Sequence, residues 1–376
     1  MVRIMRKVMV ITIIAILIAI SSNTIALETY TSGQQKISTL ARSIDRVYPS
    51  QSYNYEFRVL TSETNREGIY VVRGTIDFVN GTYTINESMV VGPGDVLRII
   101  NSDVIMNASE EDIEIIVESG GTLIVLSSRF YLSEDSQYHY RIYIKDGASF
   151  KIEDSEFHNI GEESNYVNDA GIVIETDNAT ITNVEIYDSD FAFAFVETTN
   201  CTLSNITIVN TDVAILIYYS SNITIEELAI AYADYAVYSY FSSNVIIHDS
   251  NMHIGVIIVH ASHNVSVVEN ILDDVLIGII NSRDSRVSEC YQQVDEFFDV
   301  VALNITSSVN VVVSQNYVDE DVFYYNDWIY AYNVSNIEIR GNYIDSAYYP
   351  LQISSCNNIL ITNNTFDLFV ELAMIS

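Results

Sequence analysis

An internal repeat constrains the fold of this chain more than any other feature of its sequence. From about residue 170 the chain returns every 20 to 26 residues to a turn centred on a polar residue, usually followed by apolar residues one and three positions later. These turn residues, called corner residues below, are assigned as Asn178, Asn200, Asn222, Asn244, Asn264, Arg286, Asn310, Asn336 and Asn358. A period of this length is typical of a solenoid, in which each repeat buries its apolar face against the next one.

Each repeat contains three short segments with apolar residues at alternate positions. Ile223 and Ile225 follow the corner residue Asn222, Ile230 belongs to the second segment, and Ile215 and Ile217 form the third segment of the preceding repeat. Alternation with a period of two predicts β-strands, and the β-branched residues favour them. We therefore expect an all-β solenoid with roughly three short strands per coil of about 22 residues. A leucine-rich horseshoe fits less well, because Ile and Val dominate and all three segments have strand character.

The repeat resembles a known family. Runs such as Ser221-Asn222-Ile223-Thr224-Ile225 and Asn357-Asn358-Ile359-Leu360-Ile361 are similar to the right-handed parallel β-helix repeat of the pectate-lyase-like superfamily, and the resemblance covers roughly residues 70 to 376. It implies a right-handed parallel β-helix, with successive strands about 4.8 Å apart. Such a resemblance is specific for the fold and says almost nothing about function.

The resemblance does not extend to the polygalacturonases of that superfamily. Asn210-Thr211-Asp212 and Asp273-Asp274 look like the first two of their catalytic motifs. The near match to the third motif, His253-Ile254-Gly255, precedes the Asp pair instead of following it, and no Lys occurs after Lys151 to supply the fourth. A pectate-lyase-like site remains an alternative, because Arg286 and Arg340 lie in coils that carry acidic residues.

The amino terminus predicts export. A basic stretch that ends at Lys7 precedes an apolar run from Val8 to Ile20, which is the order of a secretory signal peptide. A retained membrane anchor is the alternative, but the run is shorter than the roughly 20 residues that span a bilayer. We expect residues 1–26 to be a signal peptide and the protein to be extracellular or on the cell surface.

A capping helix is expected between the signal segment and the solenoid. Within residues 27–69, apolar residues follow helical spacing at Ile37, Leu40, Ala41, Ile44 and Val47. A short helix there would cover the open edge of the first coil of the 70–376 solenoid, although it could also bind a partner. The sequence offers no equivalent at the other end. Either the last residues close that end themselves, or the end associates with another chain.

The net charge excludes two classes of partner. Seventeen Lys and Arg against 50 Asp and Glu give a formal net charge of −33. Binding to nucleic acids needs clustered basic residues, because their contacts with phosphates release counterions. Binding to anionic membrane surfaces also needs clustered basic residues. We therefore expect neither nucleic acid nor a membrane surface as a partner.

Acidic residues recur nine positions after the corner residues. In five successive coils these positions are assigned to Asp273, Asp295, Asp319, Asp345 and Asp367. Carboxylates stacked about 4.8 Å apart repel each other by roughly 0.9 kcal/mol in water, and by about 3.5 kcal/mol at an effective dielectric of 20. Bound Ca²⁺ would relieve this repulsion, since it prefers carboxylate oxygens. Raised pKa values, or side chains that splay into water, are the alternatives.

A long coil suggests a glycan-binding surface. The coil that begins at Asn310 is 26 residues long and, with the next coil, is rich in aromatic and acidic residues. Extended loops on a solenoid often form its binding face. The candidates for binding sugars are Tyr324, Tyr325, Asp327, Trp328, Tyr348 and Tyr349. The alternative is that the bulky side chains, Trp328 among them, pack against the flank of the solenoid.

The asparagine and cysteine residues have mainly structural interpretations. Corner asparagines of stacked coils can hydrogen-bond to one another, and a second set is expected at Asn270, Asn316, Asn342 and Asn364. Eleven N-x-S/T sequons predict a glycoprotein: Asn80, Asn86, Asn107, Asn178, Asn200, Asn205, Asn222, Asn264, Asn304, Asn333 and Asn363. Cys201, Cys290 and Cys356 lie several coils apart, so we expect free thiols.

The sequence therefore favours a secreted or cell-surface, non-catalytic β-helix protein. It would bind a polysaccharide or cell-surface glycan, or assemble with neighbouring molecules. The alternative is a polysaccharide lyase, glycoside hydrolase or epimerase of the pectate-lyase-like type. The two differ in whether an ordered catalytic set lines a cleft.

Overall fold

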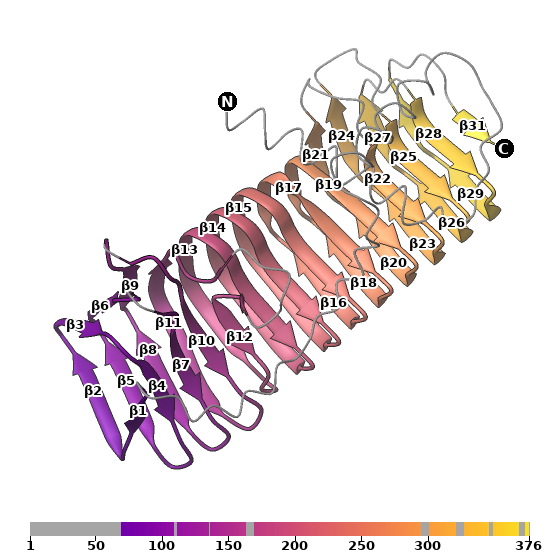
Figure 1. Cartoon of the computed structure of the whole chain (residues 1–376). Coiled ribbons are helices and arrows are strands. Elements are labelled where there is room, and N and C mark those ends of the chain that lie inside the picture. The colour runs from indigo at the N-terminus through magenta and orange to yellow at the C-terminus, as the bar shows by residue number, and fades with distance from the viewer. Residues whose placement is uncertain are drawn as a thin grey trace, which may run out of the picture.

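The chain forms a long parallel β-solenoid whose coils follow one another in sequence order along one axis (Figure 1). The computed structural model describes residues 69–108, 111–134, 136–162, 169–294, 301–320, 327–345, 349–367 and 373–375. The expected all-β fold with three strands per coil is confirmed. The signal segment and the expected capping helix lie outside the described residues. Within these ranges, no helix combines the length and apolar character needed to cross a bilayer.

The strands stack into three faces, called A, B and C, and every pairing between coils is parallel. Face A contains β2 (Thr75–Val79), β5 (Val96–Ile100), β8 (Thr122–Leu126), β16 (Ser243–His248), β18 (His263–Val268), β20 (Arg283–Ser288), β23 (Val309–Ser314), β26 (Ser335–Arg340) and β29 (Asn357–Thr362). Face B contains β3 (Thr82–Ile85), β6 (Asp103–Met106), β9 (Arg129–Leu132), β21 (Tyr291–Val294), β24 (Tyr317–Glu320), β27 (Tyr343–Asp345) and β30 (Thr365–Phe366). Face C contains β1 (Ile69–Val72), β4 (Ser88–Val91), β7 (Ile113–Val117), β10 (Tyr140–Ile144), β12 (Ile172–Ile174), β22 (Val301–Thr306), β25 (Asp327–Tyr332), β28 (Tyr349–Ser354) and β31 (Ala373–Ile375).

Six long strands bend around the corners and join the faces. They are β11 (Ser149–His158), β13 (Thr180–Val196), β14 (Thr199–Tyr218), β15 (Ser221–Tyr240), β17 (Asn251–His260) and β19 (Ile271–Ile280). In β14, for example, Leu203 pairs on face A, Ile208 on face B and Ile217 on face C. All three side chains point inward and are fully buried. The inward residues of successive coils form one continuous apolar core from Val72 to Ile353.

The corner residues adopt a backbone conformation that explains their identity. Asn200, Asn222 and Asn244 have φ values of 58°, 55° and 52°, in the left-handed region that Asn tolerates better than most residues. Each Nδ2 donates to the Oδ1 of the preceding corner residue, at 3.0 Å from Asn222 to Asn200 and 2.8 Å from Asn244 to Asn222. The expected ladder of corner asparagines is therefore confirmed.

One corner assignment is wrong. The residue at the corner after Asn264 is Asp284, not Arg286, because Asn310 Nδ2 donates to Asp284 Oδ1 at 2.7 Å and Arg286 pairs with Ser266 inside the strand. Asp284 has the left-handed φ of 54° that the corner needs. This coil is two residues shorter than a period of 22 implies, and its register shifts accordingly.

A second ladder runs inside the solenoid. Asn316 and Asn342 are almost completely buried, and Asn316 Nδ2 donates to Asn342 Oδ1 at 2.9 Å. Asn342 Nδ2 donates in turn to Asn364 Oδ1 at 2.8 Å. In the coil before Asn316, Cys290 takes the same position, and its backbone N donates to Asn316 Oδ1 at 3.1 Å. All three cysteines are free, as expected.

The last described strand extends face C. β31 pairs in parallel with β28, with Leu351 opposite Ala373. On the last strand of face A, Ile359 and Ile361 are only partly buried, whereas their counterparts one coil earlier, Ile337 and Ile339, are buried. An association of this end with another chain stays a prediction.

Candidate functional site

Face B carries two outward-facing columns of side chains, aligned by the register of its strands. The first column passes through Thr207, Ala229, Asn251, Ile271, Tyr291, Tyr317 and Tyr343. The second passes through Val209, Ala231, His253, Asp273, Gln293, Asp319 and Asp345. Residues two apart on a strand share a face, so each coil places one member of each column side by side.

The first column ends in a ladder of three stacked tyrosines. The ring centroids of Tyr291 and Tyr317 lie 5.4 Å apart, and those of Tyr317 and Tyr343 lie 5.0 Å apart, with ring planes within 8° and 10° of parallel. Tyr291 is 37% exposed and Tyr317 is 40% exposed. Because the rings cover each other's faces, the ladder offers mainly ring edges and hydroxyl groups to solvent.

The first and last tyrosines of this ladder form hydrogen bonds with carboxylates. Tyr291 Oη donates to Asp319 Oδ2, and Tyr343 Oη donates to Asp367 Oδ2, each at 3.2 Å. Burial and the hydrogen bond to Asp367 raise the pKa of Tyr343, so this phenol stays protonated in neutral solution. We call Tyr291, Tyr317, Tyr343, Asp319, Asp345 and Asp367 the Tyr–Asp ladder.

The structure changes the membership of the acidic column. The register places Gln293, not Asp295, between Asp273 and Asp319, and Asp295 itself lies outside the described residues. At the start of the column, Asp273 Oδ2 is hydrogen-bonded to His253 Nδ1 at 2.5 Å. The neutral amide of Gln293 and the hydrogen bonds from His253, Tyr291 and Tyr343 therefore reduce the repulsion expected between stacked carboxylates.

A role for Ca²⁺ stays a prediction. Among the described residues, no group of three or more His, Cys, Asp or Glu side chains comes close enough to hold a metal ion. If Asp319, Asp345 and Asp367 nevertheless share a calcium ion, added Ca²⁺ raises the melting temperature and EDTA lowers it. Differential scanning calorimetry measures both. A melting temperature that changes with neither would contradict the calcium hypothesis, and Asp345→Asn is the variant that should abolish a real effect.

Three of the six residues proposed from sequence for sugar binding lie among the described residues. Tyr324, Tyr325 and Tyr348 lie outside the described residues. Asp327 and Tyr349 pair with each other at the start of β25 and β28 on face C. Trp328 is 1% exposed and belongs to the core cluster, so its ring offers no surface on which a sugar could stack. The alternative, that this side chain packs against the solenoid, describes Trp328 correctly.

Sequence reasoning missed the tyrosine ladder. Tyr317 and Tyr343 stand seven positions after Asn310 and Asn336, and Tyr291 stands seven positions after Asp284. The wrong corner residue, Arg286, hid the third member. With the corner at Asp284, the same column position reads Tyr in three successive coils, and that signal was present in the sequence.

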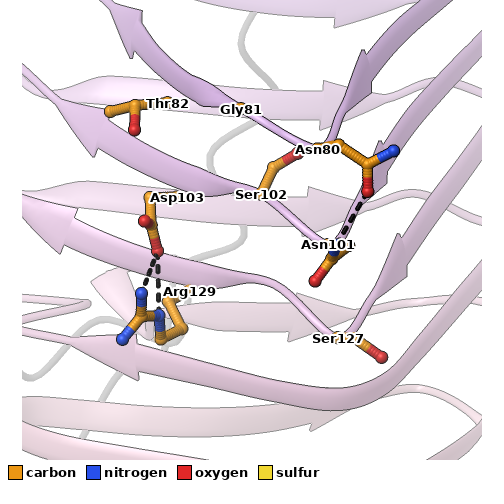
Figure 2. Close-up of a pocket in the computed structure, with 8 residues that line it drawn as sticks. All are labelled: Asn80, Gly81, Thr82, Asn101, Ser102, Asp103, Ser127 and Arg129. Atoms are coloured by element: carbon orange, nitrogen blue, oxygen red, sulfur yellow. Dashed lines mark hydrogen bonds and ion pairs between the residues drawn. The ribbon is translucent and has the colours of Figure 1, made fainter.

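A recess at the amino-terminal end of the solenoid is a weaker candidate. It lies beside the corner residues Asn80 and Asn101 and the side chain of Arg129 (Figure 2). Asn101 Nδ2 donates to Asn80 Oδ1 at 2.7 Å, and Arg129 Nε donates to Asp103 Oδ1 at 2.8 Å. These polar groups satisfy one another, so the recess is explained as part of the corner architecture.

The structure divides the sequons into two groups. Some asparagines already donate a hydrogen bond from Nδ2 to the preceding coil, so a glycan there would remove that bond: Asn107, Asn200, Asn205, Asn222, Asn264 and Asn333. Asn304 is buried. Asn80, Asn86, Asn178 and Asn363 are exposed, and the first three act as acceptors in a ladder. Glycosylation, which stays a prediction, would disturb the solenoid least at these four.

Comparison with known proteins assigns the fold. Residues 113–272 match the model of a family described as a right handed beta helix region. The periplasmic alginate epimerase AlgG, as a double mutant, is 12% identical with a TM-score of 0.61, covering 76% of this chain and 78% of that chain. A comparison with curated protein sequences finds no match.

Two further structures share the architecture. The A-module of mannuronan C-5 epimerase AlgE6 from Azotobacter vinelandii is 15% identical with a TM-score of 0.55, covering 76% of this chain and 90% of that chain. The surface protein and adhesin PfbA of Streptococcus pneumoniae is 12% identical with a TM-score of 0.53, covering 80% and 91%. The family match and these likenesses establish the right-handed parallel β-helix fold, and the resemblance noted in the sequence is confirmed for the fold.

Proposed function

We propose that this chain is an exported, non-catalytic protein that binds a hydroxyl-rich polysaccharide along the Tyr–Asp ladder. The observation that carries the proposal is the ladder itself, a row of exposed phenols and carboxylates repeated once per coil. Structural relatives support this choice, because they include a protein named as a surface adhesin and enzymes named for alginate and mannuronan.

The chemistry of the ladder favours an uncharged ligand. Tyr291 and Tyr343 already donate their hydroxyl hydrogens to carboxylates, so their phenol oxygens and the remaining carboxylate oxygens are acceptors. Sugar hydroxyls are donors that suit such a surface, and hydrogen bonds to carboxylates are among the stronger ones. With a net charge of −33, the protein would repel a polyuronate unless cations intervened.

Removing hydrogen-bonding groups from the centre of the ladder should weaken glycan binding. In the double variant Tyr317→Phe/Asp319→Asn, one hydroxyl and one negative charge are lost while the shapes of the side chains are retained. Hydrogen bonds to charged groups are worth about 1.5–3 kcal/mol, so we expect affinity to fall about 10-fold to 100-fold. Isothermal titration calorimetry against amylose, dextran, β-1,3-glucan and mannan, with alginate and polygalacturonate as anionic counterparts, measures the change.

A matched control removes a hydroxyl elsewhere. Tyr219 is 51% exposed and stacks on Phe241 at a corner away from the ladder, so Tyr219→Phe should leave binding unchanged. Binding of none of the six polysaccharides would contradict the proposal. Equal losses in the ladder variant and the control would also contradict it, because the ladder would then have no special role.

One observation favours an enzyme as the second candidate function. On the same face as the ladder, His253 is hydrogen-bonded to Asp273, and the ring of Tyr232 meets the imidazole edge-on with centroids 5.3 Å apart. A histidine oriented by a carboxylate is a common general acid or base. A polysaccharide lyase, hydrolase or epimerase would lose its activity in His253→Ala, whereas a binding protein would show no product with any of these polymers, with or without Ca²⁺.

A further inference from the structure

Face B carries a second aromatic ladder near the amino-terminal end of the solenoid. Tyr131 and His158 stack with ring centroids 4.8 Å apart, and His158 and Tyr187 stack at 5.1 Å, with ring planes within 19° and 18° of parallel. As in the Tyr–Asp ladder, carboxylates form hydrogen bonds with the polar atoms of the rings. His158 Nε2 is hydrogen-bonded to Glu156, and Tyr187 Oη donates to Glu185.

This second ladder is built like the Tyr–Asp ladder. In both, three stacked rings lie on consecutive coils beside a column that contains carboxylates, which here are Glu156 and Glu185 next to Arg129. The hydrogen bond to Glu185, together with burial, raises the pKa of Tyr187 to about 12, so this phenol is also uncharged in neutral solution. Arg129 lies over the ring of Tyr131 at 5.8 Å, but Asp103 neutralises its charge. Both ladders therefore offer hydrogen-bonding groups without an unpaired basic residue.

The two ladders lie on one continuous face. Tyr187 pairs in register with Val209, Val209 with Ala231, Ala231 with His253, and His253 with Asp273, which leads into the Tyr–Asp ladder. The coils next to Tyr187 carry small outward side chains, Thr207 and Val209 and then Ala229 and Ala231. At these column positions neither coil places a bulky side chain between the ladders, and the ring of Tyr232 lies at the adjoining corner against His253.

The separation of the ladders fits a long ligand. The second column runs from Tyr131 through His158, Tyr187, Val209, Ala231, His253, Asp273, Gln293 and Asp319 to Asp345. Its coils are about 4.8 Å apart, so it is about 43 Å long. A small sugar cannot reach both ladders, whereas an extended polymer can.

We infer that both ladders hold a single linear polysaccharide, laid along face B parallel to the solenoid axis. The inference rests on the proposed function and adds the shape and minimum length of the ligand. Once one ladder has bound, the second binds at a high effective concentration, so a chain that spans both should bind about 10²-fold to 10⁴-fold more tightly than a fragment that reaches only one.

The test compares fragments of different lengths on three proteins. The polysaccharide that binds most tightly among amylose, dextran, β-1,3-glucan and mannan is cut into size-graded fragments. Their affinities are measured for the wild type, for Tyr131→Phe/Tyr187→Phe and for Tyr317→Phe/Asp319→Asn. For the wild type, we expect affinity to begin to rise once fragments exceed the gap of about 24 Å between the two ladders, and to be at least 100-fold higher at about 43 Å, where a fragment covers both. Each double variant should lose most of this rise while still binding short fragments through its intact ladder.

The outcomes separate the inference from the proposed function. If affinity does not rise with length, or if Tyr131→Phe/Tyr187→Phe binds the polymer as the wild type does, the two-ladder inference is wrong and binding at the Tyr–Asp ladder can still stand. If no fragment or polymer binds, both fail. Tyr219→Phe serves as the hydroxyl-deleting control, and circular dichroism with the melting temperature establishes that each variant folds. His158→Gln, which removes a ring from the same ladder, should repeat the loss of the rise.

Discussion

Asn342→Ala should destabilise the solenoid by about 3 kcal/mol, because it leaves several buried polar groups without partners. Asn342 is 1% exposed. Its Oδ1 accepts hydrogen bonds from the backbone N and from Nδ2 of Asn316, each at 2.9 Å. Its Nδ2 donates to the backbone oxygen of Val313 at 3.1 Å and to Asn364 Oδ1 at 2.8 Å. Alanine removes all four bonds.

A conservative substitution at the same position provides the control for this first variant. Ser250 and Cys290 occupy the equivalent place in earlier coils, and Ser250 Oγ accepts from the backbone N of Leu228 at 3.1 Å. Asn342→Ser should therefore recover part of the lost stability. Urea unfolding followed by circular dichroism measures both variants. A loss below about 1 kcal/mol in Asn342→Ala would show that the ladder is not an important source of stability.

Gly161→Ala should be comparably damaging, for a steric reason. Gly161 has a φ of 81°, and a Cβ at this position would lie 2.2 Å from the backbone oxygen of Phe191 and 2.8 Å from the backbone N of Gly171. Left-handed backbone costs a residue with a side chain about 1–2 kcal/mol, and overpacking adds about 1–3 kcal/mol. We expect a total loss of about 2–5 kcal/mol in unfolding experiments.

A second glycine separates the two contributions. Gly74 has a similar φ of 67°, but a Cβ there would meet nothing within 4 Å. Gly74→Ala should therefore cost only the conformational part, about 1–2 kcal/mol. Equal losses in the two variants would mean that the close contact with Phe191 relaxes without penalty, contrary to the expectation.

The fold could be predicted because each coil repeats the same physical requirements. A left-handed corner favours Asn, and the strand that follows it alternates inward and outward residues, as in Asn222, Ile223 and Ile225. These local preferences recur often enough to set the number of strands per coil. Arg286 resembles a corner residue because it lies 22 residues after Asn264 and is followed by Val287. The actual corner, Asp284, is followed by the polar Ser285, so this coil lacks the apolar residue that marks the other corners.

The candidate site could be predicted only in part. The carboxylates of Asp319 and Asp345 align because they keep a constant distance from their corner residues. The pairing of Asp319 with the hydroxyl of Tyr291 depends on side-chain orientation, which a repeat pattern does not specify. The neighbours of Trp328 in the sequence favour a binding surface. On face C its neighbours in space are different, and it packs into the core.

At the corner between faces B and C, a coil can change in length without altering the register of its strands. The same number of residues separates Asn244 from His253, Asp284 from Gln293 and Asn310 from Asp319, although their coils differ in length. The ladder bond from Asn336 to Asn310 stays at 2.7 Å across a coil of 26 residues. From Asn244 to Asn358, insertions and deletions are thus confined to this corner, next to the acidic column. Segments beside a ligand can be lengthened or replaced there, while the register of the other strands in these coils is unchanged.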